Sequence, residues 1–147
     1  MSAVFSRYKS EAVVLLGWRE SAQSYELVVP HQTVGGGHLD YEVREFPAGL
    51  MRLGTIHSHA GVEAFHSERD LNDERFEDGF HLTLGNIDGE ITLACSVVVQ
   101  GYRGPLPPER LFSPYPIPWD QAPPEEDWAT AVYQKVTPLP RPIEFGT

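Results

Sequence analysis

Cysteine is nearly absent from this sequence, because Cys95 is the only one among 147 residues. A single cysteine cannot form an internal disulfide, so we expect a cytoplasmic location, where thiols stay reduced. Cys95 falls within an apolar run, which predicts a small buried core residue. Long apolar runs are lacking too: none approaches the roughly 20 residues that a membrane helix needs. The first residues show no cleavage-site pattern of a signal peptide, so we expect none.

Positive charge is also scarce in this chain. Lys and Arg number 11 against 21 Asp and Glu, and the formal net charge is −10. Phosphate binding needs clustered basic residues, so nucleic acid is excluded as an expected partner. An acidic surface suits a basic protein partner instead. The hydrophobic share of 41% is typical of a globular chain, and the length suits a single sizeable core.

Apolar runs predict a sheet in the first 100 residues. The run Ala12–Trp18 predicts a buried strand, and Tyr25–Val29 predicts its partner in a hairpin. Further predicted strands are Met51–His57, Phe80–Leu84 and Ile91–Val99. We predict an α+β fold class from these strands and a few short helices.

Helices and prolines occupy the rest of the chain. The charged segment Ser67–Asp78 predicts a short helix capped by Ser67. Of 13 prolines, 11 lie between Pro105 and Pro142, which excludes regular structure over most of that stretch. Glu125–Val136 is the one helix predicted there. We therefore divide the chain into a core, residues 1–100, and a proline-rich extension, residues 101–147, that packs on the core or on a partner.

The segment from His57 to Asp70 carries the pattern of a metal site. His57 and His59 are one residue apart at the end of a predicted strand, so their side chains point to the same face. Asp70 follows Ser67 by about one helical turn and can supply an oxygen ligand. Two imidazoles and a carboxylate leave the fourth zinc position open, which is the catalytic arrangement. We predict one zinc ion per chain at this site.

An open zinc site needs a base to take a proton from water. Glu11, Glu20 and Glu26 are the candidates upstream. Glu11 is the best placed, because it begins a buried strand, whereas the other two flank a predicted hairpin turn.

Each of these residues also has an interpretation without catalysis. A His-x-His pair occurs on many surfaces, and Ser67 with Asp70 matches a helix capping box. Glu11 could be a solvated residue before a strand. His31, His38 and His81 are taken as surface or core histidines, and Gly35–Gly37 as a mobile loop that is a candidate flap over substrate.

The joint spacing resembles the JAMM signature of the MPN+ or JAB-domain zinc metalloproteases, of which the chain looks like a prokaryotic member. The resemblance rests on His57-x-His59, then seven residues, then Ser67-x-x-Asp70, with the glutamate-led strand that begins at Glu11 upstream. It covers roughly residues 11–99. It implies an MPN/JAB core, similar to cytidine deaminases in fold, with a central mixed β-sheet.

The resemblance also implies roles and a reaction. His57, His59 and Asp70 resemble the zinc ligands, Glu11 the general base, and Ser67 the hydroxyl that supports the oxyanion. The implied activity is a zinc-dependent isopeptidase or peptidase that cleaves after the C-terminus of a ubiquitin-like protein, by attack of a zinc-activated water. The substrate-binding residues and the oligomeric state stay open.

Three features depart from the family pattern. Ala60 stands where the family commonly has proline, His66 is an unusual neighbour of Ser67, and ten residues precede Glu11 where the fold usually opens with a long helix. Two other functions stay open. One is a catalytically silent MPN-type binding or scaffold module, and the other is a peptidase that processes a sulfur-carrier or other small protein.

Overall fold

The computed structural model describes residues 11–35, 38–42, 46–59, 72, 74–75, 77–86, 89–114 and 134–138. Its strands are β1 Val13–Arg19, β2 Ser24–Val28, β3 His31–Gly35, β4 His38–Glu42, β5 Leu50–Ser58, β6 Gly79–Gly85, β7 Thr92–Val99, β8 Tyr102–Pro105 and β9 Val136–Pro138. Two short 3₁₀ helices, η1 Glu20–Ala22 and η2 Pro108–Arg110, complete the described elements.

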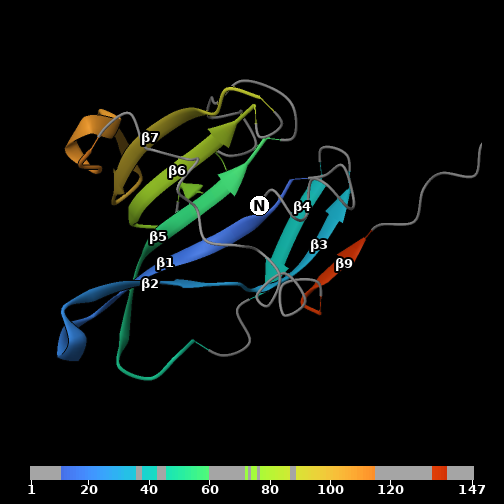
Figure 1. Ribbon diagram of the computed structural model, residues 1–147, viewed down its shortest axis with the longest axis horizontal. Helices are drawn as coiled ribbons and strands as arrows, with labels where there is room; N and C mark the ends of the chain where they lie inside the picture. The colour runs from blue at the N-terminus through green and yellow to red at the C-terminus, as the bar shows by residue number, and fades with distance from the viewer. Residues whose placement is uncertain are drawn as a thin grey trace, which may run out of the picture.

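A six-stranded mixed sheet forms the larger part of the fold, with the order β2-β1-β5-β6-β7-β8 (Figure 1). β5 and β6 pair in parallel, and every other neighbouring pair is antiparallel. A parallel pair requires a crossover connection, and residues 59–78 supply it between β5 and β6. Of the predicted zinc and serine positions, His59, Ser67 and Asp70 belong to this connection, and His57 belongs to β5.

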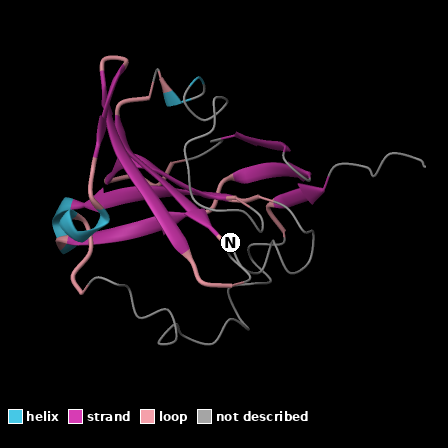
Figure 2. Cartoon of the chain, turned by 90° about the horizontal axis from the view of Figure 1, so that it is seen from above, coloured by secondary structure: helices cyan, strands magenta, loops and turns pink. Residues whose placement is uncertain are grey.

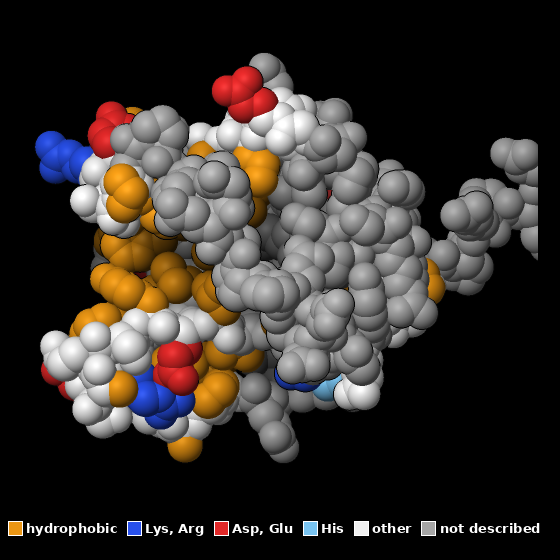
Figure 3. All heavy atoms as spheres, viewed as in Figure 1, with side chains coloured by type: hydrophobic (Ala, Val, Ile, Leu, Met, Phe, Trp, Pro, Cys, Tyr) orange, Lys and Arg blue, Asp and Glu red, His pale blue; other side chains and the backbone are white. Residues whose placement is uncertain are grey.

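The two faces of the six-stranded sheet differ in chemistry. One face carries the buried polar side chains Thr55, His57, His81, Thr83 and Ser96, which the strand registers place side by side. The opposite face is apolar, and Figure 3 shows hydrophobic side chains gathered over these strands. A buried polar face is unusual for a core and marks where a site can be built.

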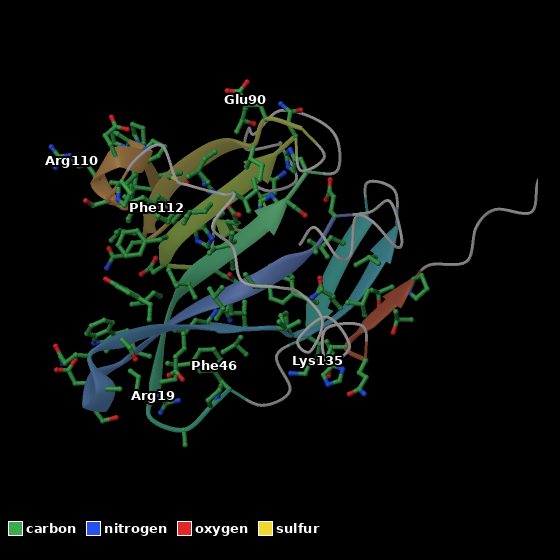
Figure 4. The ribbon with its side chains drawn as sticks, viewed as in Figure 1. Arg19, Phe46, Glu90, Arg110, Phe112 and Lys135 are labelled. Atoms are coloured by element: carbon green, nitrogen blue, oxygen red, sulfur yellow. The ribbon has the colours of Figure 1, made fainter. Side chains whose placement is uncertain are left out.

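A smaller sheet of three strands, in the order β4-β3-β9, lies beside the first strands of the larger one (Figure 2). Its core consists of Ala12, Val34 and Val136, with Val29 and Leu39 packed against them. Lys135 stands at the start of β9 (Figure 4), and its Nζ donates to the Val29 carbonyl at 3.0 Å. Contacts between residues that are far apart in the sequence thus hold this sheet together.

Gln32 joins the two sheets. Its side chain is 4% exposed; the Val13 N–H donates to its Oε1 at 2.9 Å, and its Nε2 donates to the Val13 carbonyl at 3.0 Å. β2 pairs with β1 only from Leu15 onward, so Gln32 satisfies the backbone of β1 where the partner strand has ended. The beginning of β1 is held in place in this way.

The predicted α+β class is wrong, and with it the MPN/JAB core as the expected fold. The described residues form mostly strands of a mixed sheet, and none of their helices reaches seven residues. In the predicted helix Ser67–Asp78, Asn72 and Glu74 have helical backbone, whereas Arg75 lies in a turn. None of the helices in the described ranges is long and apolar enough to cross a membrane.

The predicted helix Glu125–Val136 also needs correction at its end, because Val136 begins β9 and pairs with Gln32 of β3. A β-branched residue followed by Thr137 and a proline favours extended backbone. Residues 125–133 lie outside the described residues. β8 and β9 come from the stretch predicted as an extension, and the division at residue 100 stays a prediction.

Candidate functional site

The end of β5 brings His57 and His59 together. Both side chains are buried, with 5% and 4% of their residue surface exposed. Their rings are tilted by 50°, and the ring centroids are 5.3 Å apart. His59 continues past the end of the strand, where its N–H donates to the Leu84 carbonyl of β6 at 2.7 Å. The two imidazoles therefore occupy one small region, as their spacing predicted.

The histidine pair fits the demands of a zinc ion. Two imidazoles bound at Zn–N distances near 2.0–2.1 Å with tetrahedral geometry would have ring centroids about 5 Å apart. The observed centroid separation of 5.3 Å is close to this value. Burial of the rings also keeps competing water away from the nitrogens.

Glu11 precedes Ala12, which contacts the end of β5. Ala12 pairs with Ser58, because the Ser58 N–H donates to the Ala12 carbonyl at 2.9 Å and the Ala12 N–H donates to Ser58 Oγ at 3.0 Å. Half-buried Glu11 is one residue before this contact and two residues before Val13, where the pairing of β1 with β5 begins at His57. A register continued from Val13 and His57 would place the side chain of Glu11 on the face of His57.

The remaining predicted positions, Ser67 and Asp70, lie outside the described residues, as do His66 and Ala60. In the part of the chain that the structure describes, no group of three or more His, Cys, Asp or Glu side chains is arranged to hold a metal ion. The described residues thus provide two of the three predicted ligands, and Asp70 stays a prediction.

Sequence reasoning missed Glu74. Its residue surface is 6% exposed, and its Oε2 accepts from Arg103 Nη2 at 2.6 Å. Its Oε1 lies 3.7 Å from the Nδ1 atoms of both His57 and His81. Arg103 also donates to Ser96 Oγ. A buried carboxylate needs such a partner, because an uncompensated charge in the interior is costly.

His81 is a core histidine with both ring nitrogens engaged. Its Nε2 lies 2.8 Å from the Glu77 carbonyl, which can only accept, so Nε2 carries the proton. Neutral His81 then accepts at Nδ1 from the Thr55 hydroxyl, 2.8 Å away. His81 is therefore a structural part of the site face, as the sequence indicated. His31 is exposed on β3, and the side chain of His38 is outside the described set.

Two further features belong to β7 and β8. Cys95 is buried on the apolar face of β7, as predicted, and burial raises the pKa of its thiol to about 11. Arg103 lines a cavity of about 240 Å³ together with Asn72, Arg75, Val98 and Gly101. None of the predicted site residues that the structure describes, which are Glu11, His57 and His59, is among these lining residues.

Comparison of the chain with protein-family models and with curated protein sequences found no match.

Proposed function

We propose that this protein is a zinc-dependent isopeptidase or peptidase of the JAMM type, which cleaves after the C-terminus of a ubiquitin-like protein. The observation that supports it best is the pair of buried imidazoles at the end of β5, with ring centroids 5.3 Å apart. The sequence adds Ser67 and Asp70 at the spacing of the JAMM signature. His57, His59 and Asp70 would hold the zinc ion, which supplies a Lewis acid and lowers the pKa of a water molecule.

Glu11 supports the proposal through its position just before β1, which pairs with the strand that carries His57. A carboxylate that precedes β1, next to the contact of Ala12 with Ser58, would serve as the general base for the water that zinc activates. It would take the proton of the attacking water and return it to the leaving amine. The hydroxyl of Ser67 would donate to the oxyanion, an interaction worth about 3 kcal/mol in comparable sites.

The first experiment measures metal content by mass spectrometry on the purified protein and on a His57→Ala, His59→Ala double variant. We expect about one zinc per chain in the wild type and loss of it in the double variant. His31→Ala is the matched control, since His31 is exposed on β3. A wild-type protein that takes up no zinc even after incubation with the metal contradicts the proposal and favours the silent binding module.

The second experiment tests Glu11 as the base. In Glu11→Gln we expect cleavage of a ubiquitin-like fusion substrate to fall by about 10²–10⁴-fold, because general-base catalysis contributes that much. Zinc content should stay at the wild-type level. Glu90→Gln serves as control, because Glu90 is exposed and points outward beside β7 (Figure 4). Cleavage at the wild-type rate in Glu11→Gln would remove Glu11 from the mechanism.

A substrate panel separates the remaining alternatives. It contains linear fusions of ubiquitin-like and sulfur-carrier proteins, and isopeptide-linked conjugates of the former. Cleavage of the sulfur-carrier fusions alone would favour the processing peptidase, and zinc binding without any cleavage would favour the silent module.

A further inference from the structure

Glu74 is buried beside His57 although the proposed reaction assigns it no role. Its two carboxylate oxygens face different partners: Oε2 is held by Arg103 at 2.6 Å, and Oε1 is 3.7 Å from His57 Nδ1. Arg103 is itself anchored by Ser96. Because the guanidinium carries only donors, it fixes the orientation of the carboxylate.

The second histidine near Oε1 does not compete for this contact. His81 carries its proton on Nε2 toward the Glu77 carbonyl, and its Nδ1 accepts from the Thr55 hydroxyl. Of the two imidazoles near Oε1, His57 is therefore the one whose Nδ1 can carry a proton toward the carboxylate, across the 3.7 Å that separates Nδ1 from Oε1.

The second ring nitrogen of His57 lies near a hydroxyl group. Its Nε2 lies 3.4 Å from Thr83 Oγ1, and a hydroxyl can donate as well as accept. With the proton on Nδ1, the lone pair of neutral His57 is on Nε2, which is then the nitrogen able to bind a metal.

We propose that Glu74 is a positioning residue, which holds His57 in the tautomer with the proton on Nδ1 and so presents Nε2 to zinc. This inference rests on the proposed function. Carboxylates placed behind metal-ligating histidines orient the ring, and their loss typically weakens metal binding by about 10–100-fold.

Glu74→Gln provides a sharp test because the amide has one acceptor and one donor end. Arg103 offers only donors, so the amide oxygen will face Arg103 and the amide NH₂ will face His57. His57 must then accept at Nδ1 and carry its proton on Nε2. We therefore expect the variant to invert the tautomer of His57.

The tautomer is read from long-range ¹H–¹⁵N spectra of the histidine rings at pH 8 without metal, with His57 assigned by loss of its signals in His57→Ala. Zinc affinity is measured by competition with a chromophoric chelator. In Glu74→Gln we expect proton transfer from Nδ1 to Nε2 and a zinc Kd raised about 10–100-fold.

Glu77→Gln is the matched control. Glu77 belongs to the same crossover and also pairs with an arginine, Arg52, but its carboxylate contacts Tyr41 and not His57. The backbone carbonyl that His81 uses is unaffected by the substitution. We expect the tautomer and the zinc affinity of this control to match the wild type.

Two results would overturn the inference: a wild-type His57 with its proton on Nε2, or an unchanged zinc affinity in folded Glu74→Gln. If Glu74→Gln does not fold, the wild-type tautomer alone decides. A wild type that binds no zinc but shows the expected inversion in Glu74→Gln supports the role of Glu74 and counts against the proposed function, so the two failures are distinguishable.

Discussion

The side chain of Gln32 binds the backbone of β1 at Val13, a position that β2 does not pair with. It receives the Val13 N–H and donates to the Val13 carbonyl, at 2.9 and 3.0 Å. Glu11 is two residues before that point. The geometry of the proposed base therefore depends on a residue of the smaller sheet, which contributes no ligand.

Gln32→Ala should lower the free energy of unfolding by about 1–3 kcal/mol, because two buried backbone groups of Val13 lose their partner. Urea denaturation measures the loss. Ser21→Ala, at an exposed position of η1, should leave the stability within about 0.5 kcal/mol. Equal stability of Gln32→Ala and wild type would mean that water replaces the amide.

From the sequence alone, candidate site residues could be predicted only where their spacing determines that they lie close together. His57 and His59 follow from the period of two along a strand, and Glu11 from the apolar run that it begins. Glu74 could not be found in this way, since it stands in a segment crowded with charged residues. Glu74 is identified only by its contact with Arg103 of β8, which is distant in the sequence.

Elements with a strong apolar pattern were predicted well. The hairpin of β1 and β2 is confirmed, and the strands predicted near β5, β6 and β7 are present. β3, β4, β8 and β9 were missed. Each is short and is polar or next to glycine or proline, and pairing with another strand holds it in place. Strand propensity depends on such context more than helix propensity does.

Gly54 in β5 shows how tightly the parallel pair is fitted. It pairs with Phe80 of β6, and a Cβ at this position would collide with the Phe80 backbone carbonyl. A backbone atom cannot rotate away as a side chain can, so the strands would have to separate. Such separation would shift the histidines at the end of β5.

Gly54→Ala is expected to destabilise the protein by about 1–3 kcal/mol or more, the usual range for overpacking. Thermal unfolding followed by circular dichroism measures the effect. Gly89→Ala is the control, since an added Cβ there meets nothing within 4 Å. A Gly54→Ala variant as stable as the control would show that β5 and β6 separate easily.

At the scale of the whole molecule, the predicted fold class was wrong because we expected two helices, and none of the described helices reaches seven residues. In a charged segment with few apolar positions, hydrophobic periodicity is too weak to predict a helix. The sheet itself was foreseen as mixed, and its order was set by contacts that no local pattern reports.

The molecule should lose stability in alkali. Burial raises the pKa of Cys95 from 9.0 to about 11, and burial with the nearby Glu77 raises that of Tyr41 from 10.0 to about 12. Both groups ionise at lower pH in the unfolded chain. Their contribution to stability is full below pH 9 and is lost as the pH rises through the folded values.

Urea denaturation at pH 8, 9.5 and 10.5 tests this expectation. The free energy of unfolding should fall along the series, and the fall should be smaller in Cys95→Ala, which lacks the ionising thiol. The comparison uses the slope of the unfolding free energy against pH. The small cavity that Cys95→Ala creates lowers the stability at every pH and does not change this slope. A slope unchanged by Cys95→Ala would show that the thiol ionises equally in both states.

The polar face of the large sheet has a consequence for evolution and engineering. Thr55, His81, Thr83 and Ser96 fill an interior that aliphatic residues would pack at least as well. Selection for heat resistance alone would therefore favour exchanges such as Thr83→Val along this face. Each such exchange would remove part of the hydrogen-bonded surroundings of His57, so the most heat-resistant descendants of this protein should be those that have lost the proposed metal site.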